Sequence, residues 1–190
     1  MHTEPIFDKI IETHPWEPFI PEGAEYLIMG TFPPAQKRWS MDFFYPNAIN
    51  DFWRIMGLIY LNDKNALWDA KLRQFKLPEI KALLTEKKIA MSDTVYRAHR
   101  TKGNASDKFL EVIEPVNLEA LLSQMPNIKA IATTGEKAAN IIATLTNTEV
   151  PKMGEKVSTE AFDIWRMPST SRAYPLSLEK KAEYYSRLLM

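Results

Sequence analysis

The sequence predicts an α/β protein, a three-layer α/β/α sandwich with a central, mainly parallel four-stranded sheet. Four short apolar runs alternate along the chain with segments of helical periodicity. Each run is mostly apolar instead of alternating, which is typical of strands covered on both faces. Strand, helix, strand order of this kind favours parallel strands with helices on both faces of the sheet.

The expected elements follow one another in a regular order. The strands are the mostly apolar runs at 24–30, 88–95, 128–134 and 161–167. The helices between them place apolar residues three and four positions apart, the spacing of one helix face, at 51–61, 78–87, 118–125 and 136–146. Two more helices are expected near the ends of the chain, at 6–13 and 178–189.

Residues 1–190 are expected to form a single domain. A chain of 190 residues with 45% hydrophobic side chains can bury one substantial core. No internal repeat, low-complexity tract or long linker divides the sequence. The proline-rich segment 15–21 is interpreted as a surface approach to the first strand.

Composition argues against several classes of protein. With 24 basic and 24 acidic residues the chain has no net charge, so any contact with nucleic acid has to be local. The sequence has no cysteine and only three dispersed histidines, which predicts no disulfide, no metal site, no metal cluster and no cofactor. It also lacks a signal-like start and an apolar run of about 18 residues. We therefore expect a cytoplasmic monomer that makes no membrane contact.

Ligand sites of open parallel sheets lie beyond the carboxyl ends of the strands, where the loops converge. Gly30 does not begin a Gly-x-Gly-x-x-Gly fingerprint, and the chain has no phosphate-binding Gly-Lys-Ser/Thr loop. A nicotinamide oxidoreductase and a nucleotide triphosphatase are therefore disfavoured. No serine occupies a Gly-x-Ser-x-Gly elbow.

The loop after the first strand carries the most informative chemistry. It breaks from the strand at Gly30, passes through two prolines and then through the aromatic and amide side chains of 43–53. Aromatic rings offer a face for stacking, and amides can read a polar edge. The loop is therefore suited to a flat, hydrogen-bonding ligand such as a nucleobase.

Four motifs occur in order, each at a strand end. They are Gly30-Thr31-Phe32-Pro33-Pro34, the block from Phe44-Tyr45-Pro46 through Asn50 to Phe52-Trp53, Ser92-Asp93-Thr94-Val95, and Met167-Pro168-Ser169-Thr170-Ser171. Together they resemble the uracil-DNA glycosylase superfamily, most closely its hypoxanthine-type and mismatch-specific branch, from about residue 26 to the C-terminal helix. The resemblance implies a DNA partner and metal-free hydrolysis of the bond between deoxyribose and a deaminated base, uracil or hypoxanthine, as in base excision repair.

Base binding is expected from the first two motifs. The aromatic rings would stack on the extruded base, a contact worth about 1 to 3 kcal/mol per base. The alternative is that Phe44, with Phe43, only anchors the loop on the core. The candidate base-binding residues are Gly30, Thr31, Phe32, Phe44, Tyr45 and Asn47.

Asn50 and Asp93 are the catalytic candidates. In the similar enzymes the asparagine lies at the pocket, where its amide can orient a water or bind the base edge, although Asn50 is also a good helix N-cap worth about 1 kcal/mol. Asp93 ends the second strand, where a carboxylate can accept a hydrogen bond from the base or polarise a water, or cap the loop instead. Asp107 matches an aspartate of the hypoxanthine-type branch and is expected to cap a helix starting near Lys108. Trp53 is expected in the core.

DNA contacts are expected from two segments. Pro168, Ser169, Thr170, Ser171 and Arg172 combine hydroxyls, backbone amides and a guanidinium suited to phosphates. The second segment is a basic edge near the end of the second strand, for which a solvated face is the alternative; it consists of Arg97, Arg100 and Lys102.

Two positions depart from the family pattern. Phe32 stands where many relatives carry a polar catalytic residue, and Met167 stands where the uracil-specific branch has a histidine. Phe32 can stack but cannot activate water, and Met167 offers no donor. The leading hypothesis is a monofunctional DNA glycosylase. The alternatives are a catalytically inactive module that binds nucleic acid or nucleotides, and a hydrolase of free nucleosides.

Overall fold

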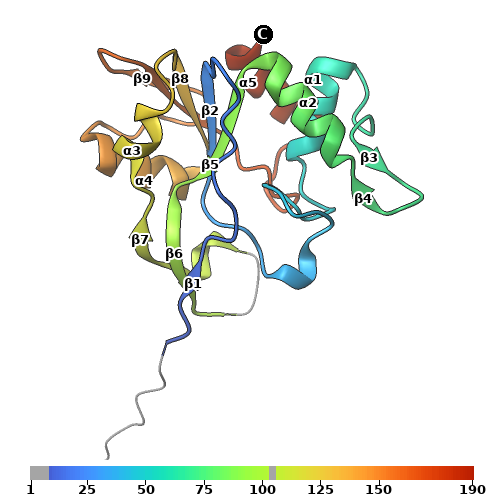
Figure 1. Ribbon diagram of the computed structural model, residues 1–190, viewed down its shortest axis with the longest axis horizontal. Coiled ribbons are helices and arrows are strands. Elements are labelled where there is room, and N and C mark those ends of the chain that lie inside the picture. The colour runs from blue at the N-terminus through green and yellow to red at the C-terminus, as the bar shows by residue number, and fades with distance from the viewer. Residues whose placement is uncertain (1–8, 103–105) are drawn as a thin grey trace, which may run out of the picture.

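A five-stranded sheet of order β5-β2-β8-β10-β9 forms the centre of the computed structural model, which describes residues 9–102 and 106–190 (Figure 1). Four of its strands run parallel, as predicted, and β9 (Lys156–Ser158) adds an antiparallel edge strand beside β10. The parallel strands are β2 (Tyr26–Gly30), β5 (Ile89–Asp93), β8 (Ala130–Thr134) and β10 (Asp163–Met167).

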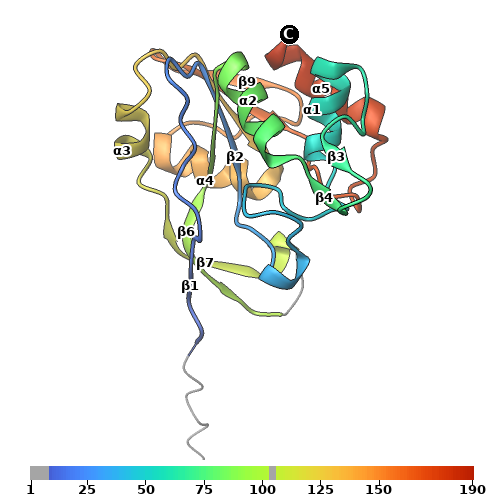
Figure 2. The same cartoon turned by 45° about the vertical axis from the view of Figure 1, so that its right-hand side comes forward.

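Helices cover both faces of this sheet. One face carries α1 (Phe52–Leu61), α2 (Leu77–Lys87) and α5 (Leu178–Leu189), and the other carries α3 (Leu118–Ser123) and α4 (Glu136–Thr146). Figure 2 shows α1, α2 and α5 grouped on one side of β2, with α3 on the opposite side. The predicted three-layer α/β/α architecture is confirmed. None of the helices in the described ranges has the length and apolar character needed to cross a bilayer.

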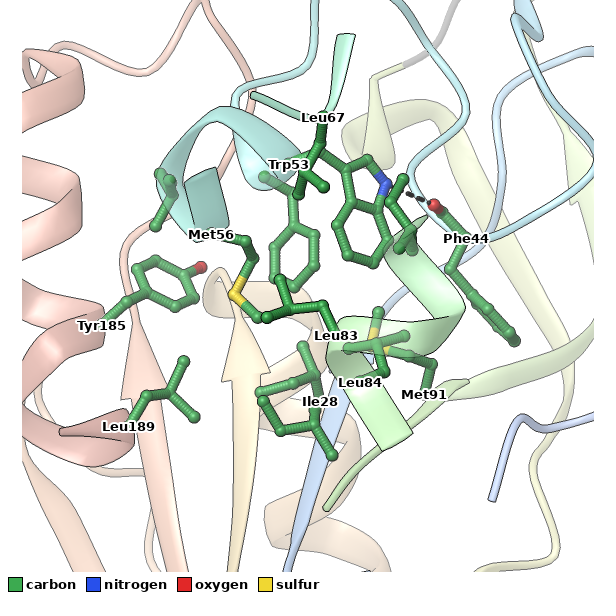
Figure 3. Close-up of a cluster of buried hydrophobic side chains, with 14 of the residues drawn as sticks. Ile28, Phe44, Trp53, Met56, Leu67, Leu83, Leu84, Met91, Tyr185 and Leu189 are labelled. Carbon is green, nitrogen blue, oxygen red and sulfur yellow. Dashed lines mark hydrogen bonds between the residues drawn. The ribbon is translucent and has the colours of Figure 1, made fainter. Parts of the chain in front are cut away.

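Side chains of the buried strands alternate between two cores. Ile28 of β2 packs toward α1, α2 and α5, whereas its neighbours Leu27 and Met29 pack toward α3 and α4. Figure 3 shows the first of these cores, in which the indole of Trp53 donates a 2.9 Å hydrogen bond to the carbonyl oxygen of Phe44. Trp53 is 1% exposed, so its predicted place in the core is confirmed. Complete burial of side chains of this size stabilises the fold by about 1.5 to 3 kcal/mol each.

A second, antiparallel sheet lies beyond the carboxyl ends of the parallel strands, at the bottom of Figure 1. Its strands are β1 (Glu12–Thr13), β6 (Val95–Arg100) and β7 (Leu110–Pro115), in the order β1-β6-β7. The helix predicted at 6–13 is wrong for residues 9–13, while 6–8 lie outside the described residues. Ile10, Ile11 and Thr13 are β-branched, which suits a strand paired with β6.

A hairpin and two 3₁₀ turns are further elements that the sequence did not predict. The hairpin of β3 (Trp68–Asp69) and β4 (Gln74–Phe75) follows α1, and the guanidinium of Arg54 lies 5.5 Å from the Trp68 and Phe75 ring centroids. The single 3₁₀ turns η1 (Gln36–Arg38) and η2 (Asp107–Phe109) lie in the connections after β2 and β6.

Strand register brings the ends of three motifs together. Gly30 pairs with Asp93 across β2 and β5, and Met167 pairs with Thr134 across β10 and β8. Beyond Gly30 the chain stays attached to β6, because the Val95 amide donates to the Thr31 carbonyl oxygen at 3.1 Å. The loops that leave these strand ends therefore surround one region.

Candidate active site

A pocket of about 560 Å³ opens where β2, β5 and β8 end. Its lining comes from parts of the chain that are distant in sequence: several residues between 30 and 50, Asp93, 106–108, Thr134 and 169–173. Small-molecule sites commonly occupy about 300 to 1,000 Å³. The pocket is therefore large enough for a nucleobase with its sugar.

Gly30 permits close contacts at the floor of this pocket. A methyl group placed on its Cα would lie 2.8 Å from the Asp93 carboxylate oxygen Oδ1 and 2.9 Å from the Tyr45 hydroxyl. Both polar groups therefore converge on the space that a side chain at residue 30 would fill. Only glycine leaves room for this arrangement.

Tyr45 is held in place by its ring and its hydroxyl. The ring stacks on Phe52 with centroids 4.1 Å apart, and the hydroxyl lies 2.6 Å from Thr134 Oγ1. Its backbone has a φ of 53°, a conformation that non-glycine residues rarely adopt. Burial, with a further contribution from the negative charge of Asp93, raises the pKa of Tyr45 well above the usual phenol range. The phenol consequently stays neutral and keeps a proton to donate.

Asp93 forms a buried pair with His14. The carboxylate oxygen Oδ2 lies 2.7 Å from His14 Nε2, and the two side chains are only 8% and 7% exposed. The other oxygen, Oδ1, faces the pocket, and no described residue donates a hydrogen bond to it. Asp93 therefore presents one free acceptor to a ligand, and it does not act as the loop cap considered from the sequence.

Asn50 uses the two ends of its amide differently. Its Oδ1 accepts a 2.9 Å hydrogen bond from the Phe52 amide at the start of α1, but the N-cap of this helix is Asp51, so Asn50 lies one residue before the cap and its predicted N-cap role is wrong. The backbone donor identifies the bonded atom as oxygen, and Nδ2 is the other end of an amide that lines the pocket. Within the described residues Nδ2 has no acceptor. Asn50 can therefore donate a hydrogen bond to a ligand, and Asp93 can accept one.

Asp107 belongs to the wall of the pocket. Its predicted role as the cap of a helix is wrong, because η2 is a single turn that leads directly into β7. The Thr31 hydroxyl instead donates to Asp107 Oδ2 at 2.8 Å. Partial loss of hydration at the pocket wall raises the pKa of Asp107 above its usual value, and the Thr31 hydrogen bond opposes this rise. Because much of the residue surface still contacts solvent, the rise is limited.

The predicted base-binding residues separate into two groups. Phe44 does not reach the pocket: it is 2% exposed and packs against Phe43 and Trp16, as in the core-anchor alternative. The physical reason is that neighbouring loop residues point in different directions, so Phe44 and Tyr45 cannot share a surface. The residues that do line the pocket are Gly30, Thr31, Phe32, Tyr45 and Asn47.

The segment 168–172 is tied to α1 and α5. The Pro168 carbonyl accepts a 2.8 Å hydrogen bond from the Tyr185 hydroxyl, and the Thr170 carbonyl accepts one of 2.9 Å from the Asp51 amide. Lys181 Nζ donates to the Ser171 carbonyl at 2.8 Å. Pro168 itself is buried, whereas residues 169–172 line the pocket and Arg172 is exposed there.

The residues of the predicted basic edge do not line the pocket, although Arg100 lies over the Phe32 ring. Arg97 is 3.7 Å from Glu114, and Arg100 Nε donates to Glu12 at 2.7 Å, so acidic residues offset both charges. Two exposed cations that sequence reasoning missed, Arg38 and Lys108, do line the pocket. Only the folding of η1 and η2 onto the pocket rim distinguishes them from other surface cations.

Sequence reasoning also missed His14 and Thr134. His14 lies 79 positions before its partner Asp93, and no spacing rule connects them. In the described parts of the chain, no group of three or more histidine and carboxylate side chains is arranged to hold a metal ion. The site is thus built from an amide donor, a carboxylate acceptor, a neutral phenol and aromatic walls.

Comparison with solved structures identifies the fold. The chain resembles the solution NMR structure of a candidate uracil DNA glycosylase from Methanosarcina acetivorans, with a TM-score of 0.60 and 21% identity over 95% of this chain and 99% of that one. The fold is therefore that of a uracil-DNA glycosylase-like α/β/α sandwich.

Similarity to a related sequence identifies the family. The chain is 30% identical over 123 residues to the hypoxanthine DNA glycosylase of Methanosarcina barkeri (strain Fusaro / DSM 804), covering 64% of this chain and 70% of that protein. No family model matches the chain. The chain belongs to the uracil-DNA glycosylase superfamily, in its hypoxanthine-type branch, and is at family level a DNA glycosylase.

Proposed function

We propose that this protein hydrolyses the N-glycosidic bond of a deaminated base, hypoxanthine or uracil, in DNA, and so starts base excision repair. The observation that carries the proposal is the pairing of a free amide donor on Asn50 with a free carboxylate acceptor on Asp93 in one pocket of base and sugar size. The relative named above is a hypoxanthine DNA glycosylase, which favours hypoxanthine.

The chemistry follows from these groups. A deaminated base carries a lactam, whose ring N–H and carbonyl need an acceptor and a donor, and Phe32 offers an aromatic wall beside the pocket. During cleavage the electron pair of the C1′–N bond leaves with the base, while the oxygen of a water bonds to C1′. Asn50 Nδ2 donates to the water or to a carbonyl of the base, and Asp93 Oδ1 accepts the proton that the water loses. The departing base takes a proton from solvent.

The second candidate function is a binding module without chemistry. It is favoured by the two departures from the family pattern, since Phe32 cannot activate water and Met167 is fully buried outside the pocket. Such a module would bind DNA in a salt-dependent way and release no base.

An excision panel tests the proposal. Duplex and single-stranded DNA containing hypoxanthine, uracil or xanthine, and the corresponding free nucleosides, are incubated with the protein, and released base is quantified. We expect release from DNA that falls at least 100-fold in Asp93→Ala and in Asn50→Ala, a loss typical of removing a general base or a transition-state donor. Binding without release from any DNA would favour the inactive module, and release from nucleosides alone would favour a nucleoside hydrolase.

A further inference from the structure

The pair formed by His14 and Asp93 lies between the two sheets. His14 directly follows β1, and its amide donates a 2.7 Å hydrogen bond to the Tyr96 carbonyl of β6. The short strand β1 therefore delivers the imidazole to the end of β5, where Asp93 is the last residue.

Three aromatic rings enclose the imidazole. Its centroid lies 5.5 Å from that of Phe32 and 5.7 Å from those of Trp16 and Phe44. Water has little access to the hydrogen bond between His14 and Asp93, since both side chains are less than a tenth exposed. A hydrogen bond to a carboxylate in such surroundings is strong and keeps its geometry.

The contacts of Nδ1, the ring nitrogen that does not face Asp93, restrict which of the two ring nitrogens carry a proton. Nδ1 is 3.2 Å from the Trp16 amide nitrogen and 3.0 Å from the Trp16 carbonyl oxygen. A neutral ring can accept from the amide and donate from Nε2 to Asp93. A protonated ring can donate to the carbonyl from Nδ1 and to Asp93 from Nε2. In both of these states Asp93 receives an N–H from His14 at Oδ2, and its Oδ1 stays directed at Gly30 and Tyr45. A neutral ring with its proton on Nδ1 would instead donate to the Trp16 carbonyl and could only accept at Nε2, which is the arrangement that the experiment below has to exclude.

We propose that His14 is a positioning residue that holds the Asp93 carboxylate through Oδ2 and turns its free oxygen Oδ1 into the pocket, supplying the acceptor that Phe32 cannot. The proposal rests on the proposed glycosylase function for its catalytic consequence. In the hydrolysis, the water that bonds to C1′ gives its proton to Asp93 Oδ1, and the His14 hydrogen bond at Oδ2 keeps Oδ1 directed at that water.

Other titratable and charged groups surround the pair, and the test has to separate their effects. Tyr45 comes from the loop after β2, and Asp107 and Lys137 come from η2 and α4. Arg100 of β6, paired with Glu12 of β1, lies over the Phe32 ring. None of these residues changes in the variants below, so a shift in the pH profile reports on His14 and Asp93.

Kinetic measurements compare His14→Phe with His14→Gln. Single-turnover excision is followed from about pH 4 to 9, with DNA affinity and thermal unfolding measured alongside. Phenylalanine removes the donor, so we expect the rate to fall about 10- to 100-fold with DNA affinity unchanged, and the acid limb to move to higher pH because the Asp93 carboxylate loses a hydrogen bond that favours ionisation. Glutamine restores an N–H near Nε2, so its acid limb should stay near that of the wild type.

His99 provides the matched control. Its Nδ1 also lies near a backbone oxygen, 2.9 Å from Ile10, but on the second sheet outside the pocket. His99→Phe and His99→Gln should keep the wild-type rate and pH profile. A wild-type profile in His14→Phe, or equal losses in both His14 variants with the acid limb unmoved, would overturn the proposal in favour of a purely structural histidine.

A measurement on the free protein separates this proposal from the proposed function. Long-range ¹H–¹⁵N NMR correlations of His14 should show a proton on Nε2 at neutral pH, and the resonance of that proton should move in Asp93→Asn, because the carboxylate that accepts its hydrogen bond is gone. This result is expected even if no base is excised from any DNA. An unprotonated Nε2, or a resonance that does not respond to Asp93→Asn, would show that the pairing itself is wrong.

Discussion

Asn50 combines a structural contact and a chemical one in a single side chain. Its Oδ1 accepts from the Phe52 amide at the start of α1, one residue before the N-cap Asp51, and its Nδ2 has no acceptor among the described residues. The sequence left helix capping and catalysis as alternatives for this residue. In the structure a contact with the helix start and a contact with a ligand are compatible, because they use different atoms of the amide.

The variant Asn50→Asp separates these two contacts. A carboxylate still accepts from the Phe52 amide and places a negative charge at a helix N-terminus, so the free energy of unfolding should stay equal or rise by about 0.3 to 1 kcal/mol. The donor at Nδ2 is lost, and excision should fall on the order of 100-fold. Chemical denaturation and single-turnover excision measure the two effects. Asn50→Ala is the comparison variant, because it should also lose about 1 kcal/mol of stability. Full activity in Asn50→Asp would show that Asn50 Nδ2 takes no part in the reaction.

At the scale of elements, α5 holds the C-terminal motif against α1. Lys181 is completely buried, and its Nζ donates to Asp51 Oδ2 at 3.0 Å and to the Ser171 carbonyl at 2.8 Å. One ammonium group therefore joins the start of α1 to the loop that forms a wall of the pocket. Breaking a buried ion pair by removing one partner costs about 3 to 5 kcal/mol, because the remaining charge is left without compensation.

We therefore expect Lys181→Met to destabilise the protein by about 3 kcal/mol, the lower end of that range, since Arg172 Nε remains 3.6 Å from Asp51 Oδ1. Excision should fall as well, because residues 169–172 lose their attachment. The matched control is Lys180→Met on the same helix, whose pair with Glu183 is exposed and should contribute less than about 1 kcal/mol. Equal unfolding free energies for the two variants, measured in urea, would contradict a structural role for the buried pair.

At the scale of the whole molecule, a protein with no net charge needs a local group of cations to bind DNA, which is a polyanion. The pocket rim carries three exposed cations from three separate segments, Arg38, Lys108 and Arg172. Arg172 Nε lies 3.6 Å from Asp51 Oδ1, but that carboxylate is shared with the buried Lys181. The predicted edge of Arg97 and Arg100 is paired with acidic residues and does not line the pocket. We infer that the rim cations, with the amides and hydroxyls of 169–171, are the main phosphate contacts.

This inference predicts a shallow salt dependence. Three neutralised phosphates correspond to a slope of about −2 to −3 in a plot of log affinity against log salt concentration. Arg172→Ala should reduce the magnitude of the slope by about one, because it removes one phosphate contact. Fluorescence anisotropy with labelled DNA measures both values. Lys129→Ala is the control, since Lys129 is exposed and pairs with Glu25 just before β8, at the opposite end of the strands; an identical drop in that variant would argue against a contact localised at the rim.

Elements whose signals are local were predicted well. The four parallel strands and five of the six expected helices are present near the expected positions, because apolar runs and three- to four-residue spacing reflect which side of an element is buried. Gly30, Asn50 and Asp93 were expected at one pocket, and all three line it. Their roles in binding and catalysis stay predictions.

Features that depend on distant partners were missed or misplaced. The segment 9–13 has no strong local preference, and pairing with β6 makes Glu12–Thr13 a strand. Lys180 and Lys181 are adjacent in the sequence, yet only the rotation of α5 against α1 buries the second of them. His14 and Asp107 join the site through contacts 79 and 76 positions apart.

The sequence by itself determined the α/β/α class and the set of motifs that meet at the strand ends, because periodicity and strand-end position are properties of short segments. The tertiary structure alone decided which of these side chains face the pocket, which partner holds Asp93, and which cations line the pocket rim. Those outcomes depend on the register of β2 with β5 and on the docking of β1 and α5. Such contacts join residues far apart in the sequence, so the spacing of residues within a short segment does not reveal them.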